Sequence, residues 1–381
     1  MSLNLHNDSN VYILGAGFSR EAGLPLVSDF LIRLRDSHPW LQKEGRLEEA
    51  ESVAKVLQYR LDAASAAYWT KLDLENIEEL FSLASSTSGN LSQHIQTAIA
   101  ATLDYAFTAT GGNPPIYLSS SDHEYDWLAK APWTSPAPQA IRDTIRNPYA
   151  VRLYSYYIAQ LLGMLNDGHA QGENTFISFN YDTLLEDSLS DLGITFGYGL
   201  HKGAATSDVS AQAQRGEYQV EVLKLHGSIN WGRRGKRTRR LTQYGSYADL
   251  RNDGAAPELI PPTWKKVFQD QLAQVWDASV QALRNATRII VIGFSIPPTD
   301  LHFKYLMAAG LKDNLSLRKI VFINPAAEAL KHRARDLFNP HYLENGLIEF
   351  QPLTLKGLCE HGNQLKELGR PMLGIFAHRI P

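Results

Sequence analysis

Glycine and small residues follow a short apolar run near the start of the chain. Val11-Tyr12-Ile13-Leu14 is followed directly by Gly15-Ala16-Gly17-Phe18-Ser19, which predicts a buried strand that enters a glycine-rich turn. Glycines let a backbone approach a pyrophosphate closely, and a following helix presents free N–H groups to the anion. The next glycine, Gly23, is too distant for the G-x-G-x-x-G spacing. An ordinary strand–turn–helix remains the alternative.

Polar residues capable of orienting a ligand or moving a proton follow two further apolar runs. Asn180 and Asp182 follow 175–179, and His226 follows 222–225. Asparagine offers both a donor and an acceptor, and Asp182 fits a ribose hydroxyl. A histidine, with an ordinary pKa of roughly 6.5, suits proton transfer at neutral pH. The alternatives are a helix cap for Asp182 and a core histidine for His226.

Two weaker signals complete the set. Gly293-Phe294-Ser295 follows the run 289–292, and Asn324 follows 319–323. Many α/β strands end in such residues, so each signal alone has little specificity. In an open α/β sheet, however, ligands bind beyond the carboxyl ends of the strands, where all five segments are predicted to lie.

In this order, the five segments resemble those of the sirtuins. Residues 15–25 are similar to the sirtuin stretch G-A-G-x-S-x-x-A-G-I-P, and 178–182 to T-Q-N-I-D. His226-Gly227 matches the pair that supplies the sirtuin catalytic base. The two weaker segments resemble the sirtuin G-T-S and I-N. The resemblance covers roughly 10–35, 174–232 and 286–352, and it leaves out 40–170.

The resemblance implies that NAD binds here as a substrate. No metal is expected, because no His/Asp/Glu cluster has metal-ligand spacing. By this reading Asn180 and His226 are catalytic: Asn180 orients the nicotinamide ribose and the water, and His226 is the general base. The expected NAD-binding residues are Gly15, Ala16, Gly17, Phe18, Ser19, Asp182, Gly293, Ser295 and Asn324.

Departures from the sirtuin pattern shape the expected activity. Phe179 and Phe294 stand where sirtuins have Gln and Thr, and Asp29-Phe30 comes three residues later than the sirtuin Asp-Phe. The single cysteine, Cys359, excludes the four-cysteine zinc ribbon of the deacylases. Between His226 and the run at 289 we expect only a basic stretch and a helix. Hydrolysis of NAD by water is then the simplest chemistry; a protein deacylase and a non-catalytic NAD or ADP-ribose sensor are the alternatives.

The pattern of apolar runs predicts a doubly wound, mostly parallel, Rossmann-like sheet of the sirtuin type with a large helical insertion. Further strands are expected at 347–351, and helices at 141–165, 183–192, 264–285, 300–311 and 326–338. Within the insertion, a helix over 72–85 is expected to expose Glu75 and Glu78 to solvent. The expected domains are a discontinuous NAD-binding domain (1–38 and 172–352), the insertion (39–171) and a C-terminal extension (353–381).

Composition gives the remaining expectations. A formal net charge of −3 offers no global reason for binding nucleic acid or membranes. The polar residues 1–10 and the absence of a long apolar run predict a cytoplasmic protein. The insertion makes the chain similar to the sirtuin-like NAD hydrolases of bacterial anti-phage defence, which implies a homo-oligomer and a HerA-type ATPase partner. The basic stretch 233–240 is either a solvated hairpin or a site for nucleic acid or an acidic protein.

Overall fold

A seven-stranded parallel sheet forms the centre of the protein. The computed structural model describes residues 8–87, 91–113, 115–117, 150–163, 172–199, 205–206, 219–233, 241–263, 271–297 and 301–360. The sheet has the order β13-β12-β11-β1-β4-β7-β5, with every neighbouring pair parallel. Its strands are β1 (Ser9–Leu14), β4 (Glu173–Ser178), β5 (Phe196–Gly197), β7 (Val220–Lys224), β11 (Arg288–Ile292), β12 (Lys319–Ile323) and β13 (Ile348–Gln351).

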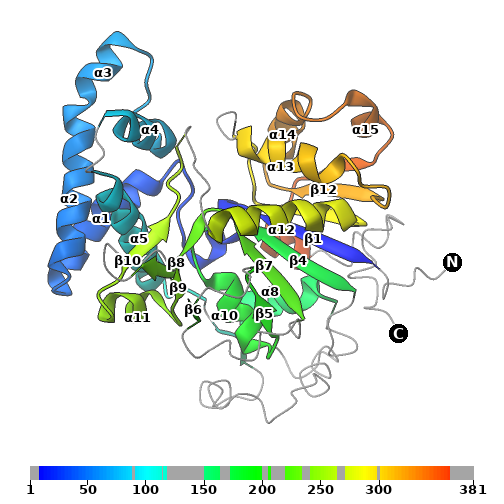
Figure 1. Ribbon diagram of the computed structural model, residues 1–381, viewed down its shortest axis with the longest axis horizontal. Helices are drawn as coiled ribbons and strands as arrows, with labels where there is room; N and C mark the ends of the chain where they lie inside the picture. Colours follow the sequence, from blue (N-terminus) through cyan, green and yellow to red (C-terminus); the bar gives the residue numbers. More distant parts are fainter. Residues whose placement is uncertain are drawn as a thin grey trace.

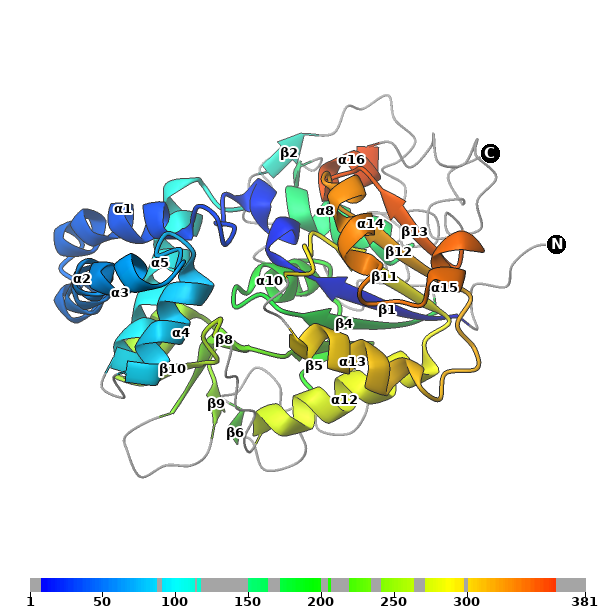
Figure 2. The ribbon, with the colours of Figure 1, turned by 90° about the horizontal axis from the view of Figure 1, so that it is seen from above.

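Helices cover both faces of this sheet (Figure 2). Alternate residues of the central strand face opposite cores: Tyr12 and Leu14 pack on one side, and Val11 and Ile13 on the other. The helices that flank the sheet or its edge are α8 (Leu153–Leu161), α10 (Leu184–Asp191), α12 (Gln271–Asn285), α13 (Leu301–Leu311), α14 (Ala327–Ala334), α15 (Pro340–Glu344) and α16 (Leu355–Glu360). The predicted doubly wound α/β class is therefore confirmed.

A helical layer lies beside the carboxyl edge of the large sheet (Figure 1). It comprises α1 (Phe30–Lys43), α2 (Leu47–Asp62), α3 (Ala64–Trp69), α4 (Ile77–Thr87) and α5 (Ser92–Ala109). The predicted helix over 72–85 begins only at Ile77, because Asp73 and Asn76 accept the N–H groups of Glu75 and Glu78 and form a turn before it. The predicted domain boundaries stay predictions.

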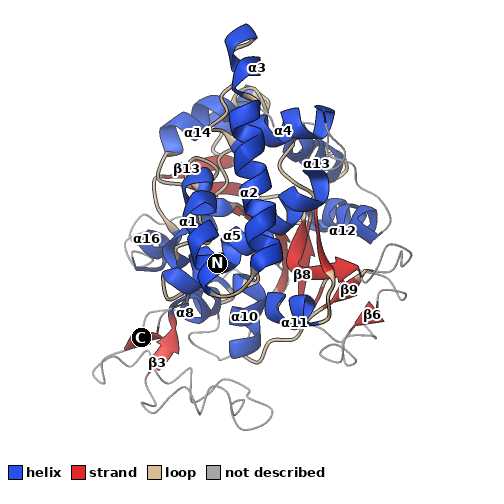
Figure 3. Ribbon diagram, turned by 90° about the vertical axis from the view of Figure 1, so that its left-hand side faces the viewer, coloured by secondary structure: helices blue, strands red, loops and turns tan. Residues whose placement is uncertain are grey.

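A second, four-stranded sheet packs against these helices (Figure 3). Its order is β10-β8-β9-β6, and its elements are β6 (Ala205–Thr206), β8 (Gly227–Arg233), β9 (Thr242–Gln243) and β10 (Ala256–Leu259), with α11 (Tyr247–Asn252) beside it. Ile229, Leu250 and Leu259 share one core with the helical layer. The expectation of only a basic stretch and a helix after His226 was wrong. Alternation of polar and apolar residues in Ser228–Trp231 was the missed strand signal.

Other expectations meet the limits of the described residues. The predicted helix over 141–165 is observed as α8, which follows a short strand β3 (Ala150–Arg152) paired with β2 (Pro115–Tyr117). The basic stretch lies outside the described residues apart from Arg233, which pairs with Glu258 at 3.1 Å. Among the helices that the structure describes, none is long and apolar enough to cross a membrane.

Candidate functional site

The glycine-rich turn after β1 crosses the turn after β11 at backbone contact. Gly15 N–H donates to Ile292 O at 3.0 Å, and Gly17 N–H donates to Gly293 O at 2.9 Å. A Cβ at Gly17 would lie 2.8 Å from Gly293 Cα, and Gly293 itself has φ +66°. These glycines are therefore required by the crossing of two parts of the chain. This crossing lies where the strand order reverses, between β1 and β11, which is where open α/β sheets bind ligands.

Most N–H groups of the turn are already satisfied within the protein. The turn continues into a short 3-10 helix, η2 (Ala16–Phe18), in place of the expected α-helix. Besides the two glycine amides, Phe18 N–H donates to Gly15 O at 2.9 Å and Ser19 N–H donates to Ala16 O at 3.2 Å. Within 15–19, Ala16 N–H is the one amide for which the described residues supply no acceptor, so it is open to an anion. The expected binding of a phosphate by this turn stays a prediction.

Ser19 connects this turn to the segment that follows β4. The buried Ser19 hydroxyl donates to Asp182 Oδ2 at 3.0 Å and accepts from Asn180 Nδ2 at 3.2 Å. Asn180 Nδ2 also donates to Gly15 O at 3.0 Å. The structure thus brings Ser19 together with Asn180 and Asp182, two predicted site residues more than 160 positions away in the chain.

These contacts fix the orientation of Asn180. Gly15 O can only accept a hydrogen bond, so the amide NH₂ must face it. Among the described residues, no protein group donates to Asn180 Oδ1. This carbonyl oxygen is available to a ribose hydroxyl or a water.

Asp182 performs the structural role that the sequence offered as an alternative. Its Oδ1 accepts from the N–H of Leu184, the first residue of α10, at 3.2 Å. Its other oxygen is the acceptor of Ser19 and lies in the wall of the cavity. One carboxylate therefore both accepts the first amide of the helix, from the position before its N-cap Thr183, and reaches the site.

His226 lies at the end of β7 and is 5% exposed. Its ring stands edge-on to Phe179, with centroids 5.3 Å apart and planes at 86°. Its main-chain carbonyl accepts from Ile260 N–H at 2.9 Å, and Ile260 O accepts from Tyr181 Oη at 2.6 Å. Ile260, directly after β10, therefore fixes both the histidine backbone and a neighbouring aromatic ring.

One cavity of about 760 Å³ joins these groups. Its size is in the range of sites for cofactor-sized ligands. All predicted site residues except one line it: Gly15, Ala16, Gly17, Ser19, Asn180, Asp182, His226, Gly293, Ser295 and Asn324. The exception is Phe18, which is 1% exposed and packs its ring against Tyr154 at 5.5 Å. Its predicted contact with the ligand does not appear in the cavity lining.

The far end of the cavity is built from the turns after β11 and β12. Asn324 Nδ2 donates to Phe294 O at 3.2 Å, which ties the two turns together. Arg333 of α14 donates to Ser295 O at 2.7 Å and lines the cavity. The sequence analysis missed Arg333, because nothing near it in the sequence marks it as part of the site.

The helical insertion supplies a wall that the sequence analysis did not expect. Asp73 and Glu75 line the cavity from the turn before α4, and Glu78 lines it from the first turn of that helix. Glu75 is exposed and pairs with Arg60, and Glu78 is half-buried. The sequence predicted that Glu75 and Glu78 face solvent. It did not predict this contact, because the insertion and the strand ends are distant in the sequence and meet only in the folded protein.

Phe179 gives the site an apolar side. Its ring lies 4.6 Å from that of Phe294 and 6.0 Å from that of Phe303. Both departures from the sirtuin pattern, at 179 and 294, therefore fall in one aromatic cluster beside His226. In the described residues no group of three or more His, Cys, Asp or Glu side chains is placed to hold a metal ion.

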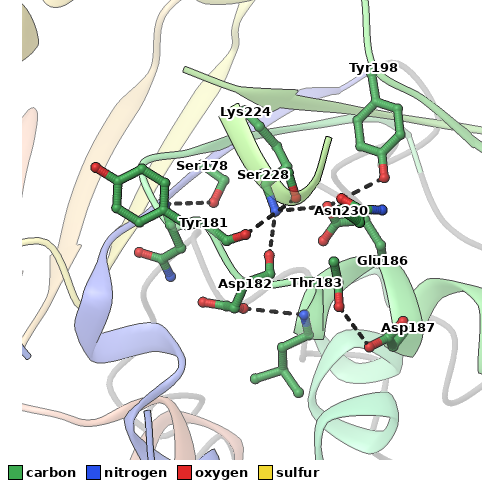
Figure 4. A network of polar contacts seen from close by, with 12 residues as sticks. Ser178, Tyr181, Asp182, Thr183, Glu186, Asp187, Tyr198, Lys224, Ser228 and Asn230 are labelled. Atoms are coloured by element: carbon green, nitrogen blue, oxygen red, sulfur yellow. Dashed lines mark hydrogen bonds and ion pairs between the residues drawn. The ribbon is translucent and has the colours of Figure 1, made fainter. Parts of the chain in front are cut away.

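Acidic residues of α10 lie next to the segment that contains Asp182 (Figure 4). Burial raises the pKa of Glu186, and Lys224 opposes that shift. Burial also raises the pKa of Asp187 to about 7, and the neighbouring Glu186 adds to the shift.

The chain is similar to solved sirtuin structures and to one family model. Solved structures that resemble the protein include Sir2 with the inhibitor EX-527, 2′-O-acetyl-ADP-ribose and a deacetylated p53 peptide, at 11% identity, 94% and 93% coverage of this chain and that chain, and TM-score 0.33. A mutant Sir2 homologue in complex with 2′-O-acetyl ADP-ribose matches at 13% identity, 95% and 94% coverage and TM-score 0.37. TM-scores this low do not support a fold assignment, so the fold is assigned from the strand order of the large sheet. No curated protein sequence matches the chain. Residues 174–345, which contain Asn180, His226, Gly293 and Asn324, match the family model of the SIR2-like domain.

Proposed function

We propose that this protein is an NAD⁺ hydrolase, an N-glycosyl hydrolase that cleaves the nicotinamide–ribose bond and releases nicotinamide and ADP-ribose. The observation that carries the proposal is the single cavity that brings Asn180, Asp182 and His226 together with the glycine turn and the ends of β11 and β12. The match of 174–345 to the SIR2-like domain supports NAD as the substrate.

The mechanism follows from the bond that breaks. Nicotinamide in NAD⁺ is a cationic leaving group, so the protein need not protonate it. The dinucleotide is bound at points remote from the scissile bond, by Ala16 N–H, Ser295 and Asn324. This remote binding orients the ribose. Asn180 Oδ1 positions a water against the anomeric carbon. As the carbon–nitrogen bond breaks and the carbon–oxygen bond forms, His226 takes the proton of that water.

The walls of the cavity favour water as the acceptor. The insertion lines one side through Asp73, Glu75 and Glu78, and Phe179 stands beside His226. An acyl-lysine peptide would have to enter past these groups. Hydrolysis therefore fits the cavity better than deacylation does.

The test is incubation of the purified protein with NAD⁺, followed by chromatography for nicotinamide, ADP-ribose and cyclic ADP-ribose. Stoichiometric release of nicotinamide and ADP-ribose supports the proposal. NAD consumption only with an acylated peptide would replace it with a deacylase. NAD binding without nicotinamide release would replace it with a sensor.

We also propose a role as an NAD-depleting effector of bacterial anti-phage defence, acting by abortive infection and held inactive until a trigger arrives. Unrestrained hydrolysis would drain the cell that makes the protein. We assign control to homo-oligomerisation and a HerA-type ATPase partner. Tyr68 and Trp69, each 82% exposed at the end of α3, support a contact with a second copy through the insertion.

Sedimentation of the wild type and of a Tyr68→Ser/Trp69→Ser variant tests this assembly. We expect concentration-dependent oligomers in the wild type and a shift to monomer in the variant. A fully active monomer at every concentration would remove the proposal.

Loss of activity with added acidic protein or DNA, abolished by charge reversal within 233–240, would assign a partner to the basic stretch.

A further inference from the structure

A buried lysine connects the strand that leads to His226 to the segment that carries Asn180 and Asp182. Lys224 is the last residue of β7, and its side chain is 1% exposed. Its ammonium donates to the main-chain carbonyl of Asp182 and to Glu186 Oε1, the latter at 2.9 Å (Figure 4). Three elements of the site, β7, the turn after β4 and helix α10, thus meet at one charged group.

Folding stability alone gives little reason for this arrangement. The Glu186 side chain is 6% exposed, so both charges have lost nearly all their water. A buried ion pair commonly contributes no more to stability than an apolar pair of similar volume. What it does provide is geometry, because a misplaced charge at such depth is strongly unfavourable.

The neighbouring contacts act on the same short segment. Ser228, at the start of β8, donates to the main-chain carbonyl of Tyr181 at 3.3 Å. Tyr198 donates to Glu186 Oε1 at 3.5 Å. Two successive carbonyls, those of Tyr181 and Asp182, are therefore held by side chains that flank His226 in the sequence.

We propose that Lys224 is a positioning residue that holds the Asn180–Asp182 segment in register with His226. This inference rests on the proposed function, since the register matters for catalysis only if both residues act on the ligand. Lys224 acts through its hydrogen bond to the Asp182 carbonyl, and Glu186 supplies the counter-charge that offsets the cost of burying the ammonium.

The test replaces the ion pair with apolar side chains, as Lys224→Met/Glu186→Leu. We expect a melting temperature within a few degrees of wild type, a kcat for nicotinamide release at least 10-fold lower, and a nearly unchanged KM. Amide hydrogen exchange in 178–185 should rise, because the Asp182 carbonyl has lost its donor.

The chain supplies a matched control. Lys319 pairs with Glu349 and donates to Gly346 O at 2.7 Å, in the same lysine–carboxylate–carbonyl arrangement at the opposite end of the sheet. Lys319→Met/Glu349→Leu should leave kcat and exchange in 178–185 unchanged. Glu186→Gln provides a second variant, which keeps the hydrogen bond from Lys224 to Asp182. It should lower stability while kcat stays within about 3-fold of wild type.

Wild-type kcat and exchange in a folded double variant would overturn the proposal. So would a kcat that falls with the melting temperature in Glu186→Gln. If the wild-type protein releases no nicotinamide, the proposed function fails by itself. Hydrogen exchange and NAD affinity then still decide whether Lys224 holds the segment.

Discussion

The amide of Gly17 donates to the carbonyl of Gly293 at 2.9 Å, and a Cβ added at Gly293 would lie 2.6 Å from Gly17 Cα. The turns after β1 and β11 are thus in direct backbone contact, with no room for a side chain between them. The glycines of the motif are therefore required for the shape of the cavity itself, whether or not a ligand is bound.

Gly293→Ala should be much more destabilising than alanine at another glycine with the same backbone angle. Gly254 also has φ +66°, but nothing lies within 4 Å of a Cβ there. Gly254→Ala should cost only backbone strain, about 1–2 kcal/mol. Gly293→Ala adds a clash with backbone and should cost about 3 kcal/mol or more. Urea unfolding measures both, and equal losses would refute the requirement for this close crossing.

Asn180→Ala and His226→Ala should each reduce nicotinamide release by about 100-fold or more, the scale for removal of a positioned general base or orienting group. Asn180→Ala also removes two buried hydrogen bonds, and should lower the free energy of unfolding by about 1–2 kcal/mol. Turnover and melting temperature should be measured on the same samples.

Asn314 supplies the control for Asn180. Its Nδ2 also donates two hydrogen bonds, to Leu283 O at 2.7 Å and Ala286 O at 2.9 Å, outside the cavity lining. Its Oδ1 accepts two more from the main chain, so Asn314→Ala should reduce stability at least as much as Asn180→Ala while turnover is retained. Near-normal turnover by a folded His226→Ala protein would eliminate the proposed mechanism.

The stability of the protein should fall as pH rises from about 5 to 7. Burial raises the pKa of Asp187 to about 7, so in this range the folded state holds a proton that an unfolded aspartate, with a pKa of about 3.9, has lost. The folded state then binds more protons, and its stability decreases with pH until both states are ionised. Asp187→Asn should flatten this slope in urea unfolding at several pH values. An unchanged slope would assign the effect elsewhere.

Activity should be indifferent to strong chelators and to thiol alkylation. Cys359, the single cysteine, is 1% exposed in the core of the large sheet. Iodoacetamide should label it only after unfolding, with full nicotinamide release retained before. Elemental analysis checks the metal, and stoichiometric zinc in the active protein would contradict the prediction.

Sequence patterns predicted the large sheet well because its strands are continuous apolar runs that end in turn residues. Each of the runs 11–14, 222–225 and 289–292 became a strand within two residues of its expected bounds. The strand ends also predicted which residues share the cavity, since parallel strands place their carboxyl ends at one edge.

The parts that sequence did not predict depend on contacts between distant segments. Arg333 and Glu78 line the cavity through packing of helices that show no local sign of it. Two of the satisfied amides of the glycine turn, those of Gly15 and Gly17, depend on carbonyls at the distant end of β11 and in the turn after it. Lys224 was an unremarked member of an apolar run, and its burial is visible only with Glu186 in place.

The position of β1 also has a consequence for synthesis. This strand is made before both of its partners, 173–178 and 288–292. A nascent chain must keep an apolar strand unpaired on one side until 288–292 has been synthesised, which is a slow and exposed route to the native state. The same delay means that the cavity is complete only when residues as late as Leu355 are present. Partial chains therefore lack the assembled site, and an interrupted translation product is harmless to the cell's NAD if the proposed activity holds.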